Sequence, residues 1–398
     1  MMERIAVGTR FTKRGQWGWV SRYNQRPDMP DTGCVQELIL VGLSTRVLAE
    51  SAVRGGIRTT AIDLFADLDT REAAHCIAVP SLLEGHLIAA IERAFPGNSS
   101  PQLVYASGID TDPDLVRSLS QTVDLIGNPA GVLQTINSPD RFFALLDSLS
   151  IPYPESCFHK PANPGDWVVK LAGTQGGTGV FSASHNIPVG AVCYYQKRLP
   201  GPSLSALFLA NGQDARVIGF NTQWNDRLDP LSPYRLSGIV NHAAITYEQK
   251  KQLGEYIAKL VKSASLVGLG TLDFMIEDGC CKVLEVNPRP SASMALFDER
   301  YPAGLLNEHI RAVAGCLGPE VRQDGRALGG FQIVYANQTG VIGDSLVWPV
   351  WVKDRPAPGS RISIDDPLCT VTAKGDSIVA VRELLAKRGQ LIGASCFA

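Results

Sequence analysis

The chain has 398 residues, 45% of them hydrophobic and 19% charged, which excludes a disordered chain and predicts a soluble globular protein of about two or three packed units. Its net charge of −2 excludes the basic field that attracts nucleic acids, and no apolar run approaches the ~20 residues of a membrane span. Nine scattered cysteines without metal-type spacing indicate reduced thiols and a cytoplasmic location.

Residues 1–35 differ in composition from the rest of the chain. Basic residues dominate this segment, Trp17, Trp19 and Tyr23 lie among them, and Glu3 is the single acid before Pro27. An organelle-targeting peptide has such a composition, but the apolar stripe of an amphipathic helix is missing. We therefore predict a loose N-terminal tail, or a gene start placed too far upstream.

The region 36–134 begins with a strand, a helix that ends at two glycines and a second strand, expected at 37–43, 46–54 and 58–63. This order predicts a parallel sheet, although the absence of G-x-G-x-x-G weakens a dinucleotide site. Ser44, Thr45 and Arg46 at the helix start leave two interpretations open. They form either an anion site or an ordinary helix cap with a surface arginine.

The following region alternates short strands and helices. A helix capped by Ser138 with Pro139 in its first turn is expected to begin it. Asn128-Pro129 marks the boundary before it. Further elements are predicted at 167–171 (strand), 191–196 (strand), 213–245 (strands), 247–266 (helix), 302–316 (helix), beyond 329 (strands with Pro/Gly turns) and 377–388 (helix).

A glycine-rich stretch follows the strand that carries Lys170. It reads Gly173-Thr-Gln-Gly-Gly-Thr-Gly179, and its lysine precedes the glycines, so it is not a Walker P-loop. Glycines allow backbone N–H groups to close over phosphate oxygens, while the lysine supplies a point charge. A flexible hairpin tip is the equally favoured alternative.

Residues 271–290 predict two strands joined by a tight turn, with Asp273 on the first and Glu285 and Asn287 on one face of the second. Three oxygen donors of this kind suit Mg²⁺, which leaves its other positions to water and phosphate. Arg289 adds a cation suited to phosphate or carboxylate oxygens. The alternative is a solvated acidic hairpin.

The turn provides a geometric test of the metal interpretation. A two-residue Asp278-Gly279 loop alone would place Asp273 opposite Leu284 and leave Glu285 on the other face. A three-residue loop or one bulge would place Asp273 opposite Glu285. The metal hypothesis therefore requires the shifted register.

Taken in order, these motifs resemble the ATP-grasp superfamily of ligases from about residue 138 to about residue 295. The series also includes Ile151-Pro-Tyr-Pro and Gln196-Lys-Arg-Leu-Pro-Gly201. Each motif alone is weak, but five in one order are specific. The resemblance implies an α/β and α+β fold: a tail (1–35), a Rossmann-like pre-ATP-grasp domain (36–134), a two-lobed ATP-grasp domain (135–325, lobes about 135–200 and 201–325) and a small β-rich C-terminal segment (326–398).

The resemblance also assigns roles to individual residues. Asp273, Glu285 and Asn287 match the metal ligands, with Mg²⁺ or alternatively Mn²⁺, and Arg289 matches the cation on the transferring phosphoryl group. The implied ATP contacts are Lys170 near the α-phosphate and adenine, the lid glycines Gly176, Gly177 and Gly179, and the adenine hinge Gln196, Lys197, Arg198 and Leu199. Two positions depart from the family: its first lysine is Arg141 here, and a usually acidic hinge position is Lys197.

The implied activity is an ATP- and Mg²⁺-dependent carboxylate–amine ligation through an acyl-phosphate, with small-molecule substrates. The stretch from Lys353 to Val371 resembles predicted carboligases related to biotin carboxylase and suggests methanofuran- or methanopterin-type coenzyme biosynthesis. Arg216 and Gln223 are candidate acceptor contacts. His242 is a candidate base, or a structural histidine. The alternatives are a bicarbonate-phosphorylating carboxylase and a non-catalytic ATP-binding regulator; the oligomeric state is left open, with a homodimer as one option.

Overall fold

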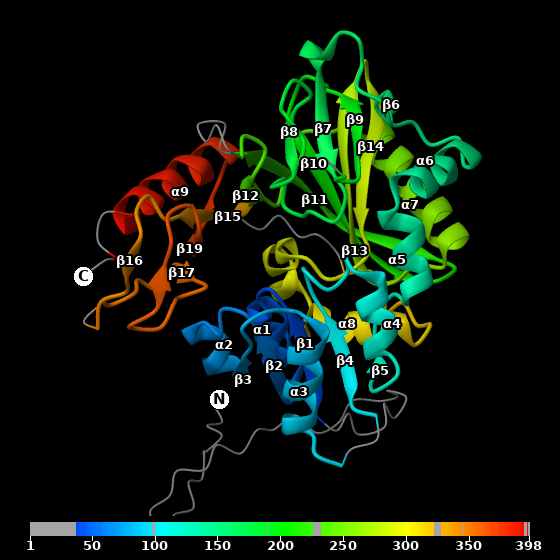
Figure 1. Cartoon of the computed structure of the whole chain (residues 1–398). Helices are drawn as coiled ribbons and strands as arrows, with labels where there is room; N and C mark the ends of the chain where they lie inside the picture. Colours follow the sequence, from blue (N-terminus) through cyan, green and yellow to red (C-terminus); the bar gives the residue numbers. More distant parts are fainter. Residues whose placement is uncertain are drawn as a thin grey trace, which may run out of the picture. The chain divides into compact units, whose positions relative to one another are not determined.

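The structure is a computed structural model, which describes residues 37–97, 100–188, 190–225, 232–321, 328–344, 346–393 and 396 (Figure 1). The described residues all belong to the second of the two units into which the chain divides, Gln36–Ala398. The predicted N-terminal tail therefore lies outside the described residues.

A five-stranded parallel sheet of order β3-β2-β1-β4-β5 opens the second unit. Its central strands β1 and β2 are fully buried, as expected of apolar runs covered on both faces of the sheet. Residues of α3 and α4 pack against one face of this sheet. The predicted β-α-β unit is thus confirmed. The elements are β1 (Leu38–Gly42), α1 (Arg46–Gly55), β2 (Thr59–Asp63), α2 (Leu68–Ala73), β3 (His75–Ala78), α3 (Glu84–Ala94), β4 (Gln102–Tyr105), α4 (Pro113–Leu119) and β5 (Asp124–Leu125).

A small four-stranded antiparallel sheet, β6-β9-β7-β8, follows two helices. Ser138 lies at the start of the second helix as predicted, although its hydroxyl donates to Asp140 (2.6 Å) and makes no cap bond. The elements are α5 (Ala130–Asn137), α6 (Pro139–Ser148), β6 (Ser156–Cys157), β7 (Trp167–Leu171), β8 (Val180–Ser182) and β9 (Cys193–Lys197), with a 3₁₀ turn at Pro164–Asp166.

The largest sheet has eight antiparallel strands in the order β14-β13-β10-β11-β12-β15-β19-β17. One core joins α5, α6 and α7 to β10, β13 and β14, and a second joins α9 to β15 and β19. The strands are β10 (Ser203–Asn211), β11 (Ala215–Asn225), β12 (Leu236–Val240), β13 (Val267–Glu277), β14 (Cys280–Asn287), β15 (Leu328–Tyr335), β17 (Val352–Lys353) and β19 (Pro367–Gly375).

The remaining elements of this region are α7 (Tyr247–Ala264), α8 (Gly304–Val313), α9 (Ile378–Gly393), the strand pair β16 (Gly340–Val341) and β18 (Arg361–Ile362), and 3₁₀ turns at Ala292–Leu296 and Asp298–Arg300. The C-terminal strands continue the large sheet, as Figure 1 shows in orange. The domain boundaries at 134, 200 and 325 remain predictions.

Two buried side chains tie the parallel sheet to the large sheet. Asn128 exchanges hydrogen bonds with the backbone of Val267 and also donates to the carbonyl of Pro288 (all 2.9 Å). His309 on α8 accepts from the Leu269 amide at Nδ1 (2.9 Å) and donates from Nε2 to the Ile126 carbonyl (3.1 Å). These bonds fix the start of β13 and the end of β14 against the parallel sheet.

None of the helices in the described part of the chain combines the length and the apolar character that a membrane crossing requires.

Candidate active site

The hairpin of β13 and β14 has the shifted register that the metal hypothesis requires. Its two-residue turn is formed by Asp278 and Gly279, both with positive φ (49° and 78°), which is the geometry of a tight type I′ turn. A register shift beside Asp273 then leaves Leu284 without a partner and sets Asp273 opposite Glu285. Thr271 pairs with Asn287, so all three oxygen-bearing side chains lie on one face of the hairpin.

The carboxylates of Asp273 and Glu285 interact directly. Burial and then the Glu285 carboxylate raise the pKa of Asp273 well above its usual range. Asp273 also accepts a bond from Gln223 (3.3 Å), one of the predicted acceptor contacts, and Asn287 donates to Glu285 (3.4 Å). Two facing carboxylates repel each other unless a proton or a cation lies between them, so this oxygen set fits a divalent cation.

The possible metal ligands at this site include an amide as well as the two carboxylates. Among the described residues no three His, Cys, Asp or Glu side chains come together as metal ligands, so a metal here would depend on the Asn287 amide and on non-protein oxygens. Mg²⁺ commonly binds in this way.

Arg289 lies directly beyond these groups and is 7% exposed. Its guanidinium donates to Asn287 (3.0 Å) and forms an ion pair with Asp110 (Nε–Oδ2 3.3 Å), a buried residue that follows β4. The sequence analysis did not identify Asp110, although an acidic side chain just beyond the carboxyl end of a parallel strand was a usable signal. Arg289 is therefore held in place from both sheets.

Lys170 pairs with Tyr194 across β7 and β9, and its Nζ lies 5.8 Å from the centre of the Tyr194 ring. Burial favours the uncharged amine, but Tyr194, Glu285 and Asp273 together raise the pKa of Lys170 above its usual value. Lys170 is thus a cation that faces the paired carboxylates. Tyr194 was missed, although it directly precedes the Tyr195-Gln196 pair of the predicted strand.

The glycine-rich stretch packs tightly against the segment before β12. Gly176 accepts a backbone bond from Leu236 (2.9 Å), and a Cβ on Gly177 would lie 2.0 Å from the Tyr234 carbonyl oxygen. Gln175 donates to Asp110 (2.6 Å) and accepts from the Gly108 amide (3.0 Å). Residues 173–179 are therefore fixed in place by backbone and side-chain bonds.

The segment Gln196–Leu199, predicted as an adenine hinge, is only partly available to a ligand. Gln196 is buried and donates to Ser156 (3.1 Å), and Leu199 is buried. The backbone amides of Lys197 and Arg198 already donate to the carbonyls of Glu155 and Asp166 (both 2.8 Å). A base at this segment would contact backbone groups other than these two amides.

Three further candidate residues lie away from this group. Arg141 is exposed on α6, and no hydrogen bond or ion pair of its side chain occurs within the described residues. Arg216 donates to the Pro319 carbonyl (3.0 Å), seven positions along β11 from Gln223. His242 is exposed.

Arg46 shows that neither interpretation of the helix start was complete. It is buried, not on the surface, and pairs with Asp354 (2.7 Å) and Glu50 (2.8 Å). The Thr45 amide and hydroxyl both donate to Asp63 (3.2 and 2.8 Å). Side-chain carboxylates of this chain thus occupy the positions that an external anion would take.

Comparisons with known proteins agree with this geometry. Residues 141–293 match the ATP-grasp domain family. The arginine-specific large chain of carbamoyl phosphate synthase from Geobacillus stearothermophilus is 26% identical over 217 residues, covering 50% of this chain and 20% of that relative. The chain thus spans about a fifth of the length of the curated relative it matches.

Solved structures share the fold over most of both chains, at sequence identities too low to show more than the fold. The biotin carboxylase domain of Hydrogenobacter thermophilus 2-oxoglutarate carboxylase has a TM-score of 0.68 at 13% identity and 90% coverage of each chain. The Thermus thermophilus N5-carboxyaminoimidazole ribonucleotide synthetase has 0.64 at 16% identity (89% and 98% covered), and the Bacillus licheniformis L-amino acid ligase 0.65 at 14% (88% and 96%). The predicted fold class is confirmed.

Proposed function

We propose, from the premise that residues 141–293 form an ATP-grasp domain, that the chain is an ATP- and Mg²⁺-dependent ligase that joins a carboxylate to an amine. The observation that carries this proposal is the bulged register of β13 and β14, which sets Asp273 against Glu285 in the field of Lys170. A hairpin without the bulge would separate the two carboxylates.

The proposed reaction has two steps. A carboxylate oxygen of the first substrate attacks the γ-phosphorus of ATP, the bond to the β,γ-bridging oxygen breaks, and ADP leaves. The amine nitrogen of the second substrate then attacks the acyl carbon, loses a proton, and displaces inorganic phosphate. Both steps depend on positioning and on neutralisation of charge, so no nucleophilic side chain is needed.

The residues of the site supply these two requirements. Asp273, Glu285 and Asn287 would hold Mg²⁺, which when bound neutralises charge on the phosphate oxygens. Lys170 binds phosphate oxygens as a point charge, and Arg289 faces the transferring phosphoryl group as a planar donor. The backbone of residues 173–179 covers the β- and γ-phosphates, which glycines permit because no side chain blocks the amides.

One observation favours a second candidate function. The Hydrogenobacter thermophilus domain that shares the fold was solved with MgADP and a bicarbonate anion. Bicarbonate has the same planar CO₂⁻ group as a carboxylate, so phosphorylation of bicarbonate followed by carboxylation of an acceptor would use the same residues. A role in methanofuran- or methanopterin-type coenzyme biosynthesis is a finer proposal that rests on the sequence between Lys353 and Val371.

An ADP-release screen tests the proposal. The chain is incubated with ATP, Mg²⁺, a panel of carboxylates that includes bicarbonate, and a panel of amines; we expect ADP to form with a particular carboxylate–amine pair. Glu285→Ala should abolish ADP formation, whereas Glu277→Ala, near the turn of the same hairpin, should not. Stimulation by bicarbonate would select the second candidate, and absence of ADP with every pair would favour a non-catalytic ATP-binding protein.

A further inference from the structure

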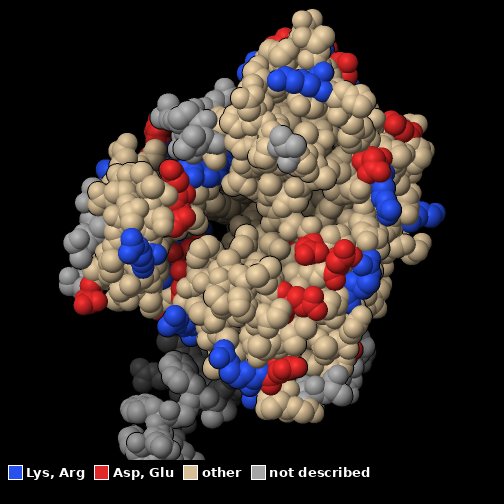
Figure 2. Space-filling view, viewed as in Figure 1, with Lys and Arg blue, Asp and Glu red and all other residues tan. Residues whose placement is uncertain are grey.

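A cavity of about 1330 Å³ adjoins the candidate active site. It begins one residue beyond Arg289, at Pro290 and Ser291, and none of Lys170, Asp273, Glu285 and Asn287 lines it. Figure 2 shows this face of the molecule hollowed between the part that holds β17, β19 and α9 and the rest, with acidic side chains along one edge. The volume exceeds that of a typical drug-sized pocket, so it accommodates a substrate larger than a free amino acid.

Much of the wall is apolar and aromatic. Phe65, Met294, Phe331 and Trp351 line the cavity, and Phe65 is 47% exposed although it is a large hydrophobic residue. Such a wall suits the apolar body of a ligand, while polar groups elsewhere in the lining can fix its orientation.

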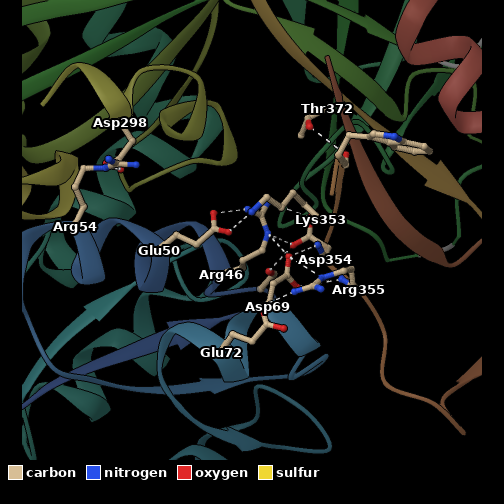
Figure 3. A network of polar contacts seen from close by, with 12 residues as sticks. Arg46, Glu50, Arg54, Asp69, Glu72, Asp298, Lys353, Asp354, Arg355 and Thr372 are labelled. Atoms are coloured by element: carbon tan, nitrogen blue, oxygen red, sulfur yellow. Dashed lines mark hydrogen bonds and ion pairs between the residues drawn. The ribbon is translucent and has the colours of Figure 1, made fainter. Parts of the chain in front are cut away.

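Most of the cations around the cavity already have partners in the chain; Arg361, an exposed lining residue, has no side-chain ion pair within the described residues. Figure 3 shows Arg46 on α1 pointing at Glu50, Asp69 and Asp354, with Lys353 also on Glu50. The other ion pairs of lining residues are Arg54 with Asp298 (2.9 Å) and Lys374 with Glu299 (3.0 Å). The paired cations are therefore poorly placed to recognise an anionic ligand.

Asp67 differs from the other acidic residues of the cavity lining. It lines the cavity and is 5% exposed, yet no hydrogen bond or ion pair to its carboxylate occurs within the described residues. An aspartate that directly precedes a helix usually accepts from an amide of the first turn, but Asp67 precedes α2 and makes no such bond. Ala66 before it has a φ of 47°, in the left-handed region, which turns the chain sharply at this point.

The side chains around Asp67 are mostly acidic and do not neutralise a negative charge on its carboxylate. Burial, followed by Asp354, Asp69 and Asp63, raises the pKa of Asp67 to about 8, and Arg46 offsets only part of this. The carboxylates of Asp63 and Asp69 already accept hydrogen bonds from backbone amides. A buried carboxylate in such a place is stabilised by any cation that reaches it.

The geometry distinguishes between two kinds of cation. Among the described residues no three His, Cys, Asp or Glu side chains are arranged to hold a metal ion, and the carboxylates near Asp67 already accept from backbone amides or pair with Arg46, so a metal at Asp67 would lack further protein ligands. A protonated amine needs only one carboxylate and an apolar wall beside it, and Asp67 with Phe65 provides both. An organic ammonium group is therefore the cation that fits.

We propose that the cavity binds an amine substrate and that Asp67 pairs with its protonated nitrogen while the apolar wall holds its body. The proposal rests on the proposed ligase function only in identifying this ligand as the amine to be joined. Binding itself is independent of ATP.

The test is isothermal titration calorimetry of the full chain without nucleotide. The probes are methylamine, butylamine and 2-phenylethylamine, each compared with methanol, 1-butanol or 2-phenylethanol of the same shape. We expect at least one amine to bind roughly 10- to 100-fold more tightly than its alcohol, the range of a charge-assisted hydrogen bond. The wild-type comparison requires no variant and so does not depend on the folding of one.

Two variants complete the test. Asp67→Asn should weaken amine binding to the level of the alcohol, whereas Glu72→Gln, an exposed acid on α2 outside the cavity, should leave it unchanged. Failure of all three amines to bind, equal binding of the alcohols, or undiminished amine binding by Asp67→Asn would overturn the proposal. Because ATP is absent, such a failure is separate from a failure to form ADP.

Discussion

Asp110 and Arg289 form a nearly buried ion pair (3.3 Å) that connects the loop after β4 to the end of β14. The other oxygen of Asp110 accepts from Gln175 in the glycine-rich stretch (2.6 Å). One carboxylate thus holds both the proposed phosphoryl-binding arginine and the loop proposed to cover the phosphates. A change in the loop position is therefore expected to affect Arg289 as well.

Gln175→Ala should weaken ATP binding. The change removes the bonds of Gln175 to Asp110 and Gly108, so ATP must order a looser loop when it binds. At about 1 kcal/mol for each bond, the KM for ATP should rise roughly 5- to 30-fold. Gln121→Ala, an exposed glutamine beside α4, is the matched control. An unchanged KM in Gln175→Ala would exclude a role for these two hydrogen bonds in ATP binding.

Lys170→Ala should raise the ATP requirement more strongly. A charge-assisted phosphate contact contributes on the order of 1.5–3 kcal/mol, which corresponds to roughly a 10- to 150-fold change in KM. Tyr194→Phe keeps the ring beside Lys170 but removes the hydroxyl, so its effect should be several-fold smaller. ATP titrations of ADP formation measure both. Equal KM values for Lys170→Ala and wild type would remove Lys170 from the phosphate site.

Gly177→Ala and Gly176→Ala form a matched pair within the glycine-rich stretch. Both residues have positive φ (76° and 59°), so each alanine costs about 1 kcal/mol of backbone strain. Only at Gly177 would the new Cβ meet a backbone atom, the Tyr234 oxygen at 2.0 Å, while space around Gly176 is open. We expect the KM for ATP to rise at least several-fold more in Gly177→Ala. Identical KM values in the two variants would contradict the packing described above.

The stability of the protein should fall in mild acid because of His309. Burial lowers the pKa of His309 to about 4 from 6.5, although the bond to Ile126 opposes this shift. Between these values the unfolded chain binds a proton that the folded protein does not. Folding stability is therefore complete above about pH 6.5 and decreases toward pH 4, by on the order of 3 kcal/mol.

Urea unfolding at several pH values measures this effect. The difference in unfolding free energy between pH 7 and pH 4.5 should be smaller in His309→Gln than in wild type, whatever the absolute stability of the variant. His75→Gln, a change at an exposed histidine, serves as the control. An identical pH dependence in His309→Gln and wild type would show that His309 is not the group that titrates.

Local patterns in the chain were sufficient for most elements near the site. The alternation of side chains in a strand placed Glu285 and Asn287 on one face, and the Asp278-Gly279 pair located the turn. The strand of Lys170, the helix of 247–264 and the β-α-β unit at the start were predictable for the same reason, because each depends on neighbours in sequence. The strand β10 and the helices α2 to α5 were not predicted as separate elements, since their patterns are short or ambiguous.

Contacts between distant segments were decided only by the tertiary structure. No local pattern specifies that Asp110 meets Arg289, that Gln175 reaches Asp110, or that Arg46 is buried among carboxylates from α1, α2 and the segment after β17. The bulge beside Asp273 is likewise not specified by a local pattern, because a bulge depends on how both strands pack on their neighbours. The sequence by itself thus determined which chemical groups the site contains. Packing of the three larger sheets determined which of these groups face one another, because that arrangement depends on burial summed over the whole core.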